Sequence, residues 1–107
     1  MSDKILLVQG DTRPILTCTL TDETTGLAIN ITGATVLLKF REAGSTTVKS
    51  TITGAVTNGA TGTVEFTWSN TALDTAGEFE GEVEITFASG GIQTVYDKLK
   101  FKVREQF

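Results

Sequence analysis

Four glutamates at alternate positions are the residues whose types and spacing most suggest chemistry: Glu78, Glu80, Glu82 and Glu84. Alternate residues of a β-strand point to the same side, so these carboxylates would share one face. Neighbouring carboxylates bind calcium or serve as the acid and base pair of a glycosidase. Calcium loops need irregular backbone with closely spaced oxygen ligands, whereas this segment has the pattern of a regular strand. A solvated, charge-paired sheet face is therefore the favoured interpretation.

A matching row of bases occupies alternate positions near the end of the sequence, from Lys98 to Arg104. If the two rows belong to one hairpin that turns near Gly90, each base faces a glutamate. The predicted cross-strand pairs are Glu78–Lys102, Glu80–Lys100, Glu82–Lys98 and, on the apolar face, Phe79–Phe101. Opposite charges across strands contribute about 0.2–1 kcal/mol per pair. The charges also fix the register, because a shift of one residue would move them to the apolar face. The same register places Asp97 on that face, so we expect a bulge or loop at residues 96–98.

Few other residues are suited to catalysis or metal binding. Histidine, the commonest general base and metal ligand, is absent. The single cysteine, Cys18, can form neither an internal disulfide nor a thiolate cluster, and its phase with Leu16 and Leu20 indicates a buried thiol. Asp11 and Asp74 fall in predicted turns, where aspartate caps backbone amides. We therefore predict no catalytic residue, no metal ligand and no cofactor, and a protein that is not an enzyme.

The elements that carry these residues are expected to be short strands. The 107 residues include 20 threonines and 11 glycines, which favour pleated surfaces and turns respectively. Apolar and polar residues alternate in residues 16–20, 36–41, 63–68, 78–87 and 98–104. Turn signals separate these runs, and residues 69–74 are too short for a stable helix. The pattern predicts one all-β domain over residues 1–107, an immunoglobulin-like two-sheet antiparallel β-sandwich, with a small β-barrel as the alternative.

The charge and the start of the sequence limit the partners and the location. A net charge of −4 disfavours nucleic acid and anionic membranes, because both repel an acidic domain. Ile5–Val8 is the only apolar run near the start, and four residues are too few for a signal peptide or a membrane span. We expect synthesis in a cytoplasm without a signal peptide, and no nucleic acid or membrane partner.

Several stretches together resemble the N-terminal domain of phage baseplate upper proteins and related virion modules. They are residues 9–14, 22–26, 31–36, 62–68, 74–79 and 81–87, and their order and spacing follow the family pattern across nearly the whole chain. The resemblance implies an immunoglobulin-like sandwich that serves as a non-catalytic structural module of a phage particle. It also implies a virion location and partners among other virion proteins, in an assembly with multiple copies.

The chain departs from that family at its end. Baseplate upper proteins continue into segments that carry a receptor-binding protein, whereas this sequence stops at Phe107. We therefore expect a baseplate or tail adaptor, or a capsid or neck decoration module, which contacts partners through a strand edge and the terminal segment. The candidate partner-binding residues are Lys4, Ile5, Leu7, Gln9, Glu105, Gln106 and Phe107. The alternative is a carbohydrate-binding or host-surface adhesion module, which would need exposed aromatics; Trp68, in phase with Val64 and Phe66, is instead predicted to be core.

Overall fold

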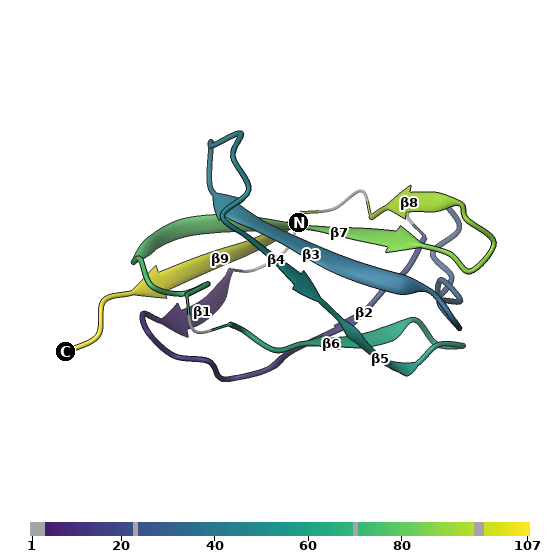
Figure 1. Cartoon of the computed structure of the whole chain (residues 1–107), viewed down its shortest axis with the longest axis horizontal. Helices are drawn as coiled ribbons and strands as arrows, with labels where there is room; N and C mark the ends of the chain where they lie inside the picture. The colour runs from purple at the N-terminus through teal and green to yellow at the C-terminus, as the bar shows by residue number, and fades with distance from the viewer. Residues whose placement is uncertain (1–3, 23, 70, 96–97) are drawn as a thin grey trace.

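The structure, a computed structural model, describes residues 4–22, 24–69, 71–95 and 98–107 (Figure 1). Within these ranges the chain forms nine β-strands and no helix. The strands are β1 (Ile5–Val8), β2 (Leu16–Thr19), β3 (Thr35–Glu42), β4 (Ser50–Thr53), β5 (Ala55–Asn58), β6 (Thr63–Phe66), β7 (Gly77–Thr86), β8 (Ile92–Thr94) and β9 (Leu99–Arg104).

The strands form two sheets that pack face to face, as Figure 1 shows. The larger sheet has the order β1-β9-β7-β3-β4, with β8 beside the far end of β7, and the smaller sheet has the order β2-β6-β5. If β2 to β7 and β9 are lettered as in immunoglobulin domains, the sheets read G-F-C-C′ and B-E-D. The predicted immunoglobulin-like sandwich is confirmed. The barrel alternative is wrong, because the two sheets do not pair with each other to close.

The core between the sheets is built around a cluster of aromatic rings. Phe40 lies at its centre, with its ring centroid 4.9 Å from that of Phe79 and 5.2 Å from those of both Trp68 and Phe101. All four side chains are at most 2% exposed. Trp68 is therefore a core residue as predicted, and its indole N–H donates a hydrogen bond to the carbonyl of Pro14 at 3.1 Å. Buried tryptophans generally need such a partner for the N–H group.

The register of β7 and β9 follows the predicted hairpin. Glu78 pairs with Lys102, Phe79 with Phe101 and Glu80 with Lys100. Beyond this ladder, β8 pairs with β7 in a different register. The last pair with β8 is Glu84–Thr94, and the first pair with β9 is Gly81–Leu99. Between these two pairs the segment that leads from β8 to β9 is two residues longer than the stretch of β7 opposite it. The predicted bulge fell on residues 96–98, of which Tyr96 and Asp97 lie outside the described residues.

Two glycines allow close contacts that the core requires. Gly54 alone joins β4 of the larger sheet to β5 of the smaller one, so the chain changes sheets at this residue (Figure 1). A Cβ atom there would lie 2.5 Å from Cγ2 of Val64 and 2.8 Å from Cε1 of Phe66. At Gly81, in the middle of β7, a Cβ atom would lie 2.8 Å from Cδ1 of Leu38 and 2.9 Å from Cε2 of Phe101. Both positions therefore need a residue without a side chain.

Candidate functional site

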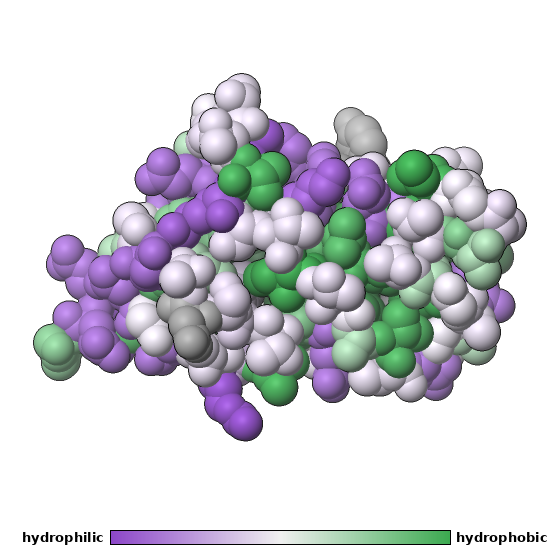
Figure 2. All heavy atoms as spheres, viewed as in Figure 1, coloured by the Kyte–Doolittle hydropathy of each residue, from purple (hydrophilic) through white to green (hydrophobic). Residues whose placement is uncertain are grey.

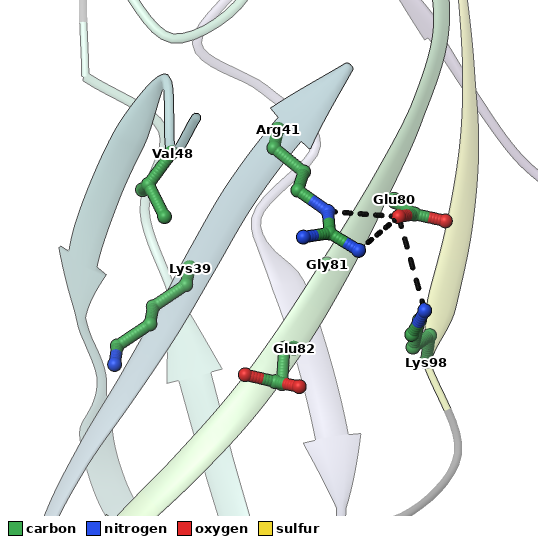
Figure 3. A pocket seen from close by; sticks show the side chains of 7 residues that line it. All are labelled: Lys39, Arg41, Val48, Glu80, Gly81, Glu82 and Lys98. Atoms are coloured by element: carbon green, nitrogen blue, oxygen red, sulfur yellow. Dashed lines mark hydrogen bonds and ion pairs between the residues drawn. The ribbon is translucent and has the colours of Figure 1, made fainter. Parts of the chain in front are cut away.

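The glutamates of β7 lie on the outer face of the larger sheet, and three of them, Glu78, Glu80 and Glu84, are held by bases from the neighbouring segments. Arg41 of β3 pairs with Glu80 at 2.6 Å, and Lys98 approaches the same carboxylate at 3.9 Å (Figure 3). Lys39 pairs with Glu84 at 3.2 Å. The charge-paired face predicted from the sequence is thus present. The predicted Glu82–Lys98 pair is wrong, because Lys98 lies before the start of β9 and its amine is within ion-pair distance of Glu80.

The hollow among these side chains offers little room for a ligand. It has a volume of about 40 Å³ and is lined by Lys39, Arg41, Val48, Glu80, Gly81, Glu82 and Lys98 (Figure 3). A space of that size holds about one water molecule. The carboxylate of Glu80 is already occupied by two cations, Arg41 and Lys98. In the described part of the chain, no group of three or more acidic, cysteine or histidine side chains is placed to hold a metal ion.

Glu78 lies at the β1 end of this face and is bound by two lysines. Lys4 reaches its carboxylate at 2.6 Å and Lys102 at 3.1 Å, and these hydrogen bonds lower the pKa of Glu78. A carboxylate with a lowered pKa in the folded state stabilises the fold at neutral pH, and this contribution is lost as the pH falls below its ordinary value of 4.5.

We expect Glu78→Gln to lower the free energy of unfolding slightly at pH 7 and to lower it less at pH 3. Urea denaturation at both pH values in low salt would measure this, and added salt should shrink the difference, since the pairs are exposed. Glu82→Gln is the matched control, because Glu82 lies on the same face and makes no ion pair with any described residue. An equal pH dependence in the two variants would contradict the assignment.

Cys18 lies on β2 and faces the core, as its phase predicted. Burial raises the pKa of its thiol to about 11, so little thiolate exists at pH 8. We expect the native protein to react with iodoacetamide at pH 8 at least about tenfold more slowly than the urea-unfolded chain. Mass spectrometry of quenched samples would measure both rates, and equal rates would contradict burial of the thiol.

The two sets of predicted contact residues come together at one edge of the larger sheet. β1 is the outermost strand, and it pairs in parallel with β9, so that Val8 lies opposite Arg104. The amide of Gln9 continues the ladder to the carbonyl of Arg104 at 2.8 Å. The terminal residues 105–107 therefore leave the fold beside the end of β1. Gln106 follows this path, with its side-chain oxygen near Gly10.

The side chains of this edge divide between the core and the solvent. Leu7 is only 4% exposed and packs in the core, so its side chain is removed from the candidate contact surface. Ile5 is half-buried against the same core. Gln9 is also half-buried and donates to the carbonyl of Asp74 at 3.0 Å. Leu6, which the sequence prediction omitted, is 72% exposed.

The terminal residues and Lys4 remain accessible. Lys4, Glu105, Gln106 and Phe107 are all exposed. The guanidinium of Arg104 lies 5.3 Å from the centre of the Phe107 ring, a cation–π contact that brings the ring back toward the end of β9. The accessible part of the edge thus consists of Lys4, Leu6 and the terminal segment 105–107.

A shallow apolar groove runs beside this edge, where β1 of one sheet faces β2 of the other. It has a volume of about 90 Å³ and is lined by Ile5, Leu7, Pro14, Ile15, Leu16, Thr17 and Trp68. Ile15 is 38% exposed at its mouth. Both flanking strands are sheet edges, so the sandwich is open along this side. Sequence reasoning missed the groove, since residues 14–17 and Trp68 meet only through tertiary contacts.

Charge is distributed unevenly between the two sheets. The strands of the smaller sheet carry one charged residue, Glu65, and otherwise expose mainly threonines. Figure 2 shows the contrast: strongly hydrophilic side chains gather over the larger sheet and the end of the molecule that holds the C-terminus, whereas pale and green residues cover the part over β5 and β6. The basic residues therefore concentrate on the sheet that contains β1.

No helix in the described ranges is long and apolar enough to cross a membrane. The chain matches no model of a known protein family, and no curated protein is similar to it in sequence.

Proposed function

We propose that this chain is a non-enzymatic structural module of a bacteriophage particle, which docks on other virion subunits through its β1 edge and terminal segment. The observation that carries the proposal is the open edge strand with Leu6 72% exposed, beside which residues 105–107 leave the fold. An unpaired strand edge is a template for a further strand, and proteins with no use for one usually cover or charge it.

The sequence resemblance to baseplate upper proteins supports a place in a tail, baseplate, capsid or neck. The charged face of the larger sheet supports a docking role rather than catalysis. Glu78, Glu80 and Glu84 are each bound by at least one base, and the hollow beside Glu80 is close to the size of a water molecule. A structural module of this kind works through its edges and ends, in multiple copies within an assembly.

The alternative, a carbohydrate-binding module, needs exposed aromatic rings on which sugars stack. Among the described aromatic side chains, Phe107 alone is exposed. Trp68 and the other five phenylalanines are buried or half-buried. One ring at the end of the chain makes a poor platform for a sugar chain. This distribution favours the structural role, and a glycan array with the purified protein would measure the alternative directly.

The test is to look for the chain in purified phage particles and to disturb the β1 edge. We expect mass spectrometry to detect the chain in particles released by cells whose genome encodes it. Leu6→Asp should leave the free energy of unfolding within about 0.5 kcal/mol, because surface substitutions have small effects. It should reduce incorporation of the chain into particles at least about tenfold, since a charge is placed in the proposed contact.

Ile92→Asp is the matched control for this substitution. Ile92 is 67% exposed, close to the value for Leu6, but it lies on β8 away from the β1 edge. Normal incorporation of Ile92→Asp together with loss of Leu6→Asp would support the proposal. Absence of the chain from particles would overturn the virion role, and equal incorporation of both variants would overturn the role of the β1 edge.

A further inference from the structure

The outer strand β1 presents an unpaired backbone. The amide of Gln9 bonds to β9, and alternate residues of a parallel strand direct their backbone groups to the same side. Leu7 and Ile5 therefore also direct theirs to β9, whereas Leu6 directs its N–H and C=O toward the open side. No other described strand pairs with β1. A further strand can add at this position through main-chain hydrogen bonds.

The inner side of such a strand would lie over the apolar groove. Ile5 and Leu7 point inward from β1 and line the groove together with Pro14, Ile15 and Trp68. Side chains of an added strand alternate in the same way, so every second one would enter the space between β1 and β2. Apolar residues at those positions would fill it and cover Ile15, which is now 38% exposed.

The outer side of the same strand would meet an excess of positive charge. Lys102 lies opposite Leu6, and Arg104 lies opposite Val8. Lys4 and Lys102 share one carboxylate, that of Glu78, and Arg104 makes no ion pair with any described carboxylate. Three cations, Lys4, Lys102 and Arg104, thus accompany one paired anion, Glu78, along this strip, and Glu105 follows in the terminal segment. Acidic residues at the alternate positions of the added strand would complement them.

We propose that the partner at the β1 edge is an extended protein segment in which acidic and apolar residues alternate. This inference rests on the proposed docking role of that edge and adds the chemistry of its occupant. The alternation of such a segment is that of β7 (Gly77–Thr86), which places its glutamates beside the bases of β9 and its apolar residues in the core. At the β1 edge the bases Lys102 and Arg104 lie one strand further in, on β9, so the acidic side chains of the partner would reach them across Leu6 and Val8.

The test uses two synthetic peptides and the whole isotope-labelled chain. One peptide has the sequence of residues 77–86, and the other replaces its four glutamates by lysines. We expect the glutamate peptide to shift the NMR signals of residues 5–8 and of Ile15, Leu16 and Trp68. The lysine peptide should bind at least about fivefold more weakly. Failure of both peptides to bind, equal binding of both, or shifts confined to β3 and β9 would overturn the proposal.

Two double variants of the domain change the charges of the protein and keep the glutamate peptide constant. Lys102→Glu with Arg104→Glu should weaken binding of the glutamate peptide about fivefold or more. Lys39→Glu with Lys98→Glu makes the same change of charge on the same sheet, away from β1, and should leave binding unchanged. Equal weakening in both double variants would contradict a site at the edge. The peptide results and the particle assay can fail separately. If Leu6→Asp is lost from particles but the glutamate peptide does not bind, the β1 edge docks through another chemistry, which overturns this inference and leaves the proposed function standing.

Discussion

Phe40→Ala is expected to destabilise the domain more than any other single substitution proposed here. The ring contacts Trp68, Phe79 and Phe101 at centroid distances of 4.9–5.2 Å and is completely buried, so its loss leaves a cavity that three large rings cannot easily fill. Buried Phe→Ala changes cost about 3–5 kcal/mol, against a total of about 5–15 kcal/mol for a typical domain. Urea denaturation followed by the fluorescence of Trp68 would measure the loss.

Phe107→Ala is the control for this prediction. It removes the same atoms from an exposed position at the end of the chain, and it should leave the free energy of unfolding unchanged within about 0.5 kcal/mol. A loss below about 1.5 kcal/mol for Phe40→Ala would mean that the two sheets close over the gap, and the aromatic cluster would not then be the centre of the core.

Gly54→Ala is expected to have the second largest effect, of about 1–3 kcal/mol or more. The added methyl group would lie 2.5 Å from Val64 and 2.8 Å from Phe66, both of which are completely buried, so these side chains or the backbone must move. The strain falls on the one residue that joins β4 to β5, and we expect it to weaken the attachment of β5 to β6. Hydrogen exchange of the β5 and β6 amides would locate the effect, and thermal unfolding would give its size.

Gly91→Ala distinguishes this steric effect from a general response to the loss of a glycine. A Cβ atom at Gly91 would meet nothing within 4 Å, and its backbone is not in the left-handed region. The substitution should therefore be neutral or slightly stabilising, since alanine restricts the unfolded chain. If Gly54→Ala were as harmless as Gly91→Ala, the close packing at the sheet crossing would be contradicted.

Those parts of the fold that depend on alternation could be predicted from the sequence. The Glu78–Lys102 and Phe79–Phe101 pairs followed from two runs of strict alternation with opposite charges, which admit one register. The core position of Trp68 followed from its phase with Val64 and Phe66. In each case the alternation within the strand and the burial of the core specify the same face and register, because a shift of one residue would expose the apolar side chains.

The side chains that β1 exposes could not be predicted, because Ile5, Leu6, Leu7 and Val8 are all apolar and show no alternation. This run does not indicate that Leu7 faces the core and Leu6 the solvent. The parallel pairing with β9 determines which of the two side chains is buried. The Arg41–Glu80 pair was missed for a related reason. It joins β3 to β7 across 39 residues of sequence, and a prediction based on the last hairpin alone assigned Glu80 to Lys100.

The parallel pairing of β1 with β9 has a mechanical consequence. β1 runs in the same direction as β9, so tension that pulls the start of β1 and the end of β9 apart slides the two strands past each other. The hydrogen bonds between them then carry the load together and must rupture at once, whereas strands peeled from one end lose them in turn. A domain pulled from these two points would resist extension best in this arrangement.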